Sequence, residues 1–176
     1  MSRIPTHTVD DAPEASRSLL ESAIEFSPTG WPLNLHAQMA HSPAVLAAYT
    51  SLRRATAAHG TVGPKLSSAL MLATASTVAN EYAIRITSRL ASRMGWSDDQ
   101  VAALQTGSTV DDHKIDVLTG LVREATANLG SVEDATWKTA QHAGWNDEQL
   151  AEAFAYLGLT VFTGYFLNYA QTDVDV

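Results

Sequence analysis

The sequence GWSDDQVA at residues 95–102 recurs as GWNDEQLA at residues 144–151. Each copy is typical of a junction between two helices. Glycine suits the left-handed position that follows a last helical turn, because it has no Cβ atom. Ser97 and Asn146 are favoured N-cap residues, and the glutamine three positions after each can complete a capping box. The repeat therefore predicts two helix corners.

The segments on both sides of these corners are also rich in helix-forming residues. Apolar residues recur at three and four positions, and the breaks fall at glycine, proline and Ser/Asp clusters. Valine and threonine do not alternate with polar residues over a sustained stretch, so strands are not expected. We predict an all-α fold with about eight or nine helices. They are expected near residues 10–26, 33–41, 43–59, 64–79, 81–94, 98–106, 111–128, 132–143 and 147–170.

The length of 176 residues favours one substantial core. We assign residues 1–30 to an N-terminal arm and helix and residues 31–176 to a single helical domain. Residues 1–9 are expected to pack on a neighbouring subunit. The sequence has no run of about 18 apolar residues and no hydrophobic stretch of a secretory signal at its start. These features predict a cytoplasmic protein without a membrane partner.

Charge is unevenly distributed along the chain. The net charge of −8 argues against a nucleic-acid partner, which needs clustered lysine and arginine. Residues 53–93 nevertheless hold six of the eleven basic residues and a single acidic one. Three of these, Arg85, Arg89 and Arg93, form a stripe on one helix face, opposite the residues that turn inward. An interface between subunits and a solvated face both explain this stripe, and neither places it at a pocket.

The stretch from Leu70 to Gln100 resembles the carboxymuconolactone decarboxylase and alkyl hydroperoxidase D (AhpD-like) superfamily. It combines a small apolar helix, the junction Asn-Glu-Tyr-Ala at residues 80–83, an alanine-rich helix and the first Gly-Trp corner. The similarity extends to residues 32–46 and to the last helix through Asn168, and covers residues about 30–175. It implies an AhpD-like multi-helix orthogonal bundle and a homo-oligomer, either a trimer or a dimer of trimers.

Peroxidase members of this superfamily carry a Cys-x-x-Cys-x-x-x-His motif that is missing here. Aligned on the tyrosine of the junction, the cysteine positions are Asn80 and Ala83, the histidine position is Thr87, and a glutamate position falls near Ser68. The chain contains no cysteine. Amide, methyl and hydroxyl groups cannot cycle through a disulfide, so thiol peroxidase chemistry is excluded. We expect no bound cofactor.

Chemistry without thiols needs a proton donor or acceptor and a cation for a substrate carboxylate. Glu81 is the candidate catalytic residue, and an ion pair with Arg85 one turn later is the competing interpretation. Around it we expect a pocket formed by the junction, by two histidines and by an asparagine of the last helix. The expected pocket residues are Ser68, Asn80, Tyr82, Ala83, Thr87, His36, His41 and Asn168.

The two histidines of this pocket do not predict a metal site, because their five-residue spacing does not place two ligands on one helix face. Two functions stay open. One is a cofactor-independent lyase or hydrolase that acts on a small organic acid or lactone. The other is a non-catalytic oligomeric scaffold or a small-ligand-binding protein on the same fold. A small-molecule ligand or substrate is the expected partner.

Overall fold

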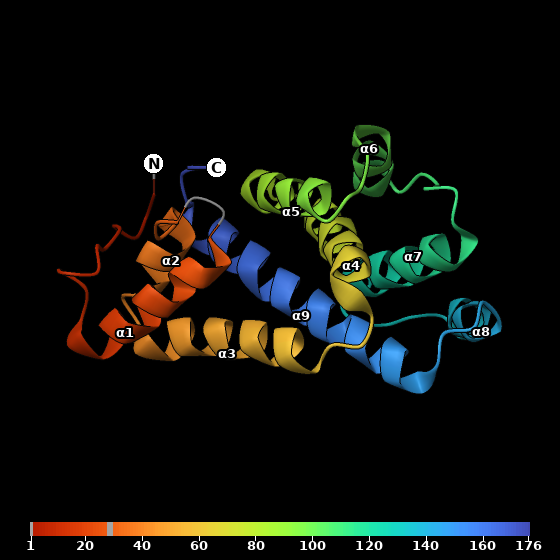
Figure 1. Cartoon of the computed structure of the whole chain (residues 1–176), viewed down its shortest axis with the longest axis horizontal. Coiled ribbons are helices and arrows are strands. Elements are labelled where there is room, and N and C mark those ends of the chain that lie inside the picture. The colour runs from red at the N-terminus through yellow and green to blue at the C-terminus, as the bar shows by residue number, and fades with distance from the viewer. Residues whose placement is uncertain (1, 28–29) are drawn as a thin grey trace.

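The computed structural model describes residues 2–27 and 30–176, and within these ranges every regular element is a helix (Figure 1). The predicted all-α fold is thus confirmed. The N-terminal group is α1 (Glu14–Ala23), the short 3-10 helix η1 (Ile24–Phe26), α2 (Asn34–Met39) and α3 (Pro43–His59). The other helices are α4 (Gly63–Val78), α5 (Glu81–Arg93), α6 (Asp98–Thr106), α7 (His113–Ala127), α8 (Asp134–His142) and α9 (Asp147–Ala170).

The helices α4 and α9 form the centre of the bundle. α4 packs against α5, α7 and α9, and α9 also contacts α3 (Figure 1). Residues 68–75 of α4 are all buried, because their side chains are small or apolar. At Gly164 of α9, an added Cβ atom would lie 2.9 Å from Val78 Cγ1 of α4. Glycine at this position therefore allows the two central helices to approach closely.

The two Gly-Trp corners make the same contacts. Both capping boxes predicted from the sequence are present. Trp96 Nε1 donates to the carbonyl of Lys65 at 2.9 Å, and Trp145 Nε1 donates to the carbonyl of Lys114 at 2.8 Å. Each lysine ammonium also lies over the ring of its tryptophan, 4.6 and 4.3 Å from the centroid. The structural repeat therefore extends beyond the two corner sequences. It also covers the helix pair that precedes each corner, α4–α5 for the first and α7–α8 for the second.

The N-terminal arm packs on the helices of its own chain. The backbone N–H of Arg3 donates to Ala170 O at 2.8 Å, and Gln38 Nε2 donates to Ile4 O at 2.7 Å. These polar groups of residues 2–9 find partners on α2 and at the end of α9. The expected contact of this arm with a neighbouring subunit stays a prediction. Residue 1 lies outside the described part of the chain.

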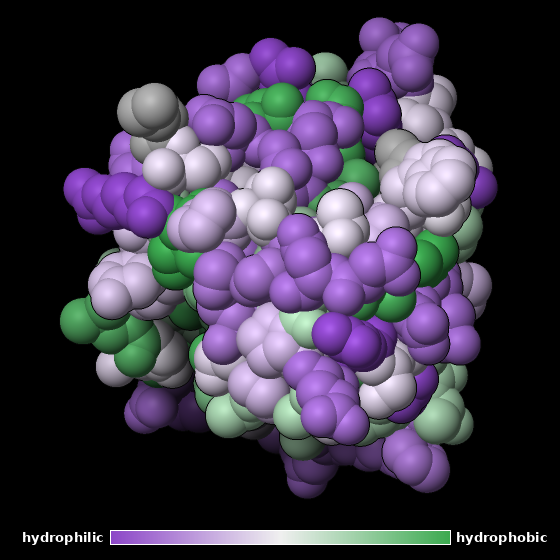
Figure 2. Space-filling view, turned by 90° about the vertical axis from the view of Figure 1, so that its left-hand side faces the viewer, coloured by the Kyte–Doolittle hydropathy of each residue, from purple (hydrophilic) through white to green (hydrophobic). Residues whose placement is uncertain are grey.

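The surface over the N-terminal helices is mostly hydrophilic, with scattered apolar atoms (Figure 2). Among the described residues, α9 is the one helix whose length and mean hydropathy of 1.4 would allow it to cross a membrane. Nine of its residues are buried inside the bundle, however. Burial in the core accounts for the apolar residues on one side of α9, whereas Phe154, Tyr165 and Tyr169 are apolar or aromatic side chains on its exposed side.

Candidate functional site

A cavity of about 250 Å³ lies where the N-terminal helices meet the central bundle. Its walls come from η1, α2, α3, α4, α5 and α9. Polar groups of His36, Tyr49 and Arg53 reach this mostly apolar space. A concave apolar site with a few convergent polar groups is the usual form of a small-molecule site. The main apolar contributors are Phe26, Leu33, Leu35, Met71, Ile86 and Leu90.

His36 of α2 lines this cavity and is only 1% exposed. Its Nε2 atom lies 3.2 Å from the hydroxyl of Tyr49, whereas its buried Nδ1 atom has no hydrogen-bond partner among the described residues. Burial, followed by the positive charge of Arg53, lowers the pKa of His36 to about 4. The imidazole is therefore neutral at pH 7, with one nitrogen held by the tyrosine and the other unpaired.

Tyr49 and Arg53 lie one turn apart on α3, so both side chains reach the same cavity. Burial raises the pKa of Tyr49, which keeps its hydroxyl protonated at neutral pH. Arg53 is half-buried, and its guanidinium carbon lies 4.9 Å from the centre of the Phe26 ring. The site therefore combines a cation, a protonated hydroxyl and a neutral imidazole, and the exposed Glu25 contributes a carboxylate to its lining.

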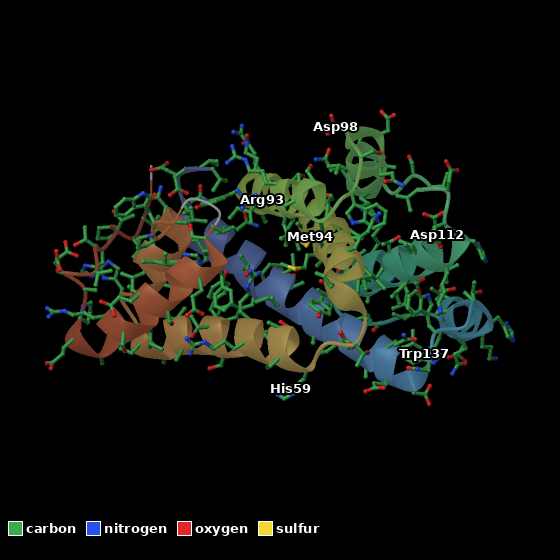
Figure 3. All side chains as sticks on the ribbon, in the orientation of Figure 1. His59, Arg93, Met94, Asp98, Asp112 and Trp137 are labelled. Atoms are coloured by element: carbon green, nitrogen blue, oxygen red, sulfur yellow. The ribbon has the colours of Figure 1, made fainter. Side chains whose placement is uncertain are left out.

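Arg89 and Arg93 of α5 also line the cavity, from exposed positions. Arg93 and its neighbour Met94 mark the end of α5 in Figure 3. The prediction that the arginine stripe lies away from any pocket was wrong for these two residues. The cavity extends along α5 toward its last turn, and long arginine side chains can reach it from the flank of the helix.

Three of the expected pocket residues line the cavity, namely His36, Ala83 and Thr87. The Thr87 hydroxyl donates to the Ala83 carbonyl at 2.7 Å, so it is satisfied within α5. Ala83 presents only a methyl group. The positions aligned with the second cysteine and the histidine of the superfamily motif thus form part of the wall, and His36 is the one acid–base group among the three.

Asn80 and Asn168 contact each other, but neither lines the cavity. Asn80 Oδ1 accepts a hydrogen bond from Ala83 N at 2.9 Å and caps α5. Its Nδ2 donates to Asn168 Oδ1 at 2.7 Å. The residue at the first cysteine position is therefore a helix cap that joins the start of α5 to the end of α9.

Ser68 and His41 also lie outside the cavity lining. The Ser68 hydroxyl donates to Lys65 O at 2.7 Å and accepts from Trp96 Nε1 at 3.2 Å, so it supports the first Gly-Trp corner. His41 is exposed, and its ring packs against the ring of His7 at a centroid distance of 4.0 Å. Within the described residues, no group of three or more His, Cys, Asp or Glu side chains is placed to hold a metal ion.

Tyr82 is 1% exposed and lies outside the cavity lining. Its hydroxyl donates to the carboxylate of Asp175, which also accepts from Asn34 N at 2.8 Å. Burial and the Asp175 carboxylate raise the pKa of Tyr82. Tyr82 and Asp175 thus anchor the C-terminal tail to the start of α2, the helix that carries His36.

Replacing Tyr82 by phenylalanine should weaken this anchor. We expect Tyr82→Phe to lower the free energy of unfolding by about 1–2 kcal/mol, because a partly buried hydrogen bond to a charged group is lost. Urea unfolding measures this change, and hydrogen exchange of α2 should become faster. Tyr165→Phe is the matched control, since Tyr165 is 53% exposed on α9. Equal stability of the two variants would show that the tail does not support α2.

Glu81 lies on the outer side of α5, with a side chain that is 70% exposed. It pairs with Arg85 at 2.6 Å, as in the competing interpretation, and it does not line the cavity. Catalysis by Glu81 stays a prediction. The residues that sequence reasoning missed are Tyr49 and Arg53, for which the only signal was their one-turn spacing on a predicted helix.

Comparison with solved structures places this arrangement among known folds. An AhpD-core, peroxidase-related protein from Ralstonia eutropha JMP134 superposes with a TM-score of 0.85 and 12% identity, over 99% of this chain and 92% of that one. The debrominase Bmp8, as a cysteine-to-alanine variant in complex with 2,3,4-tribromopyrrole, gives a TM-score of 0.84 and 14% identity, over 100% and 93% of the two chains. A peroxidase-related protein from Silicibacter sp. TM1040 gives 0.80 and 14%, over 98% and 91%.

These similarities show that the chain has the AhpD-like fold. Because the sequence contains no cysteine, this chain cannot carry out thiol chemistry on that fold. No protein-family model matches the sequence, and no curated protein matches it. A shared fold does not determine function, which depends on the residues of the cavity itself.

Proposed function

We propose that this protein binds a small, mostly apolar organic acid or lactone in the cavity and acts on it as a cofactor-independent lyase or hydrolase. The observation that carries the proposal is the convergence of His36, Tyr49 and Arg53 on one apolar cavity. Arg53 supplies positive charge for a carboxylate or for a developing oxyanion. His36 Nδ1 supplies an unpaired nitrogen for proton transfer. Neither role requires a thiol.

A bound anion would strengthen His36 as a base. With a pKa of about 4 the imidazole holds a proton weakly. A substrate carboxylate beside Arg53 offsets the charge that disfavours the imidazolium, and thereby raises the pKa of His36. In the tautomer whose Nε2–H donates to the Tyr49 hydroxyl 3.2 Å away, that bond holds the ring in place and Nδ1 is the nitrogen that takes the proton. Proton transfer is thus coupled to substrate binding.

Ligand binding without turnover is the second candidate. The low pKa of His36 favours it, because a base of pKa about 4 is poorly matched to proton abstraction at neutral pH. In this case Arg53 and the apolar walls hold the ligand, and His36 only orients it. The Bmp8 complex with a small halogenated pyrrole supports the general idea that this fold accommodates small organic molecules.

Calorimetric titration with a panel of small aromatic and aliphatic acids and lactones tests the proposal. We expect at least one saturable ligand, with an affinity that falls about tenfold or more in Arg53→Gln, because a half-buried charge pair is lost. Arg54→Gln is the matched control, since Arg54 is exposed and does not line the cavity. Absence of binding across the panel, or equal losses in both variants, would refute the proposal.

The same panel separates the two candidates. Product formation that follows binding selects the enzyme, and binding without any product selects the ligand-binding protein. A hydroperoxide supplied with a dithiol reductant should give no turnover, because the chain has no cysteine. The oligomeric scaffold, as a trimer or a dimer of trimers, is a form of the second candidate. Light scattering of the purified protein tests that assembly.

A further inference from the structure

A second cavity adjoins the first, and the inference drawn from it rests on the proposed function. It has a volume of about 350 Å³ and lies between the end of α3, the start of α4 and α9. Phe26, Arg53, Met71 and Leu90 line both cavities. The two spaces therefore share a wall of side chains.

This shared wall consists of side chains that can change rotamer. Met71 is unbranched and adapts readily to different shapes. Arg53 and Phe26 are both half-buried, and their cation–π contact at 4.9 Å is weak at such a position. Joining the cavities would require rotation of these side chains about their own bonds and no change of backbone. The guanidinium would remain at the boundary between them.

The second cavity suits an uncharged chain. Ala57, Pro64 and Leu159 contribute apolar walls, while Ser67 and Tyr156 contribute hydroxyl groups. Arg53 is the one charged residue in the lining that the structure describes. The first cavity, in contrast, contains the acid–base groups. The volumes of the two cavities together fall within the roughly 300–1,000 Å³ typical of small-molecule sites.

We propose that the two cavities form one binding site for an elongated organic acid. The carboxylate binds Arg53 at the boundary, the reacting group lies beside His36 in the first cavity, and an uncharged side chain of the ligand fills the second. The substrate class is thus a carboxylic acid that is branched next to its carboxylate, with one substituent in each cavity.

Phenylacetate and 2-phenylhexanoate are suitable probes, because they differ by a butyl chain on the carbon next to the carboxylate. Methyl NMR reports each cavity separately, since Leu35 lines only the first and Leu159 only the second. We expect phenylacetate to shift the Leu35 methyl signals alone. The longer acid should shift both and bind at least about tenfold more tightly, because it buries additional methylene groups.

Ala57→Phe fills the second cavity from an exposed position on α3, so the variant should fold. It should remove the affinity gained from the butyl chain and leave phenylacetate binding unchanged. Ala58→Phe adds the same bulk at the next exposed position, outside both linings, and should change neither affinity.

Two results separate this inference from the proposed function. If Leu35 responds to both acids but Leu159 never does, or if Ala57→Phe retains the gain, the joined site is refuted and the proposed function stands. If neither acid binds or shifts Leu35, the failure extends to the proposed function itself.

Discussion

Replacing His36 by asparagine is expected to lower the turnover of an accepted substrate about hundredfold or more, with a smaller effect on affinity. Asparagine is polar and can still bond the Tyr49 hydroxyl, but it cannot take up a proton near neutral pH. His36 is 1% exposed and is the only histidine among the described residues that line the cavity. No neighbouring imidazole can therefore replace it. Steady-state kinetics on the best substrate of the panel measure the effect.

Two further variants locate the proton acceptor. Tyr49→Phe removes the hydroxyl 3.2 Å from Nε2 and should lower turnover about tenfold, since the ring loses its orienting partner. Glu81→Gln should leave turnover unchanged, because Glu81 lies outside the cavity lining and pairs with Arg85. The opposite pattern, with turnover lost in Glu81→Gln and retained in His36→Asn, would return the catalytic role to Glu81.

The helices could be predicted because their signals are local. The capping boxes at residues 97–100 and 146–149 depend on side chains only three positions apart, and both are formed. The tryptophan–lysine contacts could not be predicted in the same way. They join residues 31 positions apart, such as Lys65 and Trp96, and depend on how whole helices pack. Local chemistry therefore determined the elements, and packing determined their partners.

The candidate site was only partly predictable for the same reason. Ala83 and Thr87 were found from the alignment with the superfamily motif, and both line the cavity. Tyr49 and Arg53 carry no motif, and their role depends on the packing of α3 against α1 and α9. Glu81 is a candidate because it lies at the junction between two helices. Its position on a helix alone does not show whether its side chain faces the cavity or the solvent in the assembled bundle.

The source of the polar groups differs from the one implied by the resemblance. That resemblance places chemistry on α4 and α5, at the positions of Ser68, Asn80, Ala83 and Thr87. Here Ser68 bonds the tryptophan of the first Gly-Trp corner and Asn80 caps α5. Ala83 and Thr87 line the cavity. His36, which was an expected pocket residue, and the half-buried Arg53 line the cavity from α2 and α3. The residues at these four positions are compatible with the fold without thiols, because the polar side chains among them are satisfied locally.

Acidification is expected to destabilise the protein through His36. Its pKa is about 4 in the folded state, against 6.5 for an ordinary histidine. Between these values the unfolded chain binds a proton that the folded protein does not, so stability rises with pH across this window. The contribution is fully present above pH 6.5 and is lost as the pH falls toward 4. The pKa difference corresponds to about 3 kcal/mol of unfolding free energy.

Urea unfolding at a series of pH values from 7 to about 4, the lower limit being the folded pKa of His36, measures this loss. Carboxylates also titrate at low pH, but they are common to wild type and His36→Asn, so the difference between the two curves isolates the imidazole. His36→Asn should lose about 3 kcal/mol less on acidification, whereas His113→Asn, at an exposed position on α7, should follow wild type. Parallel curves for wild type and His36→Asn would mean that His36 is not held neutral. The coupling of anion binding to proton uptake would then lose its physical basis.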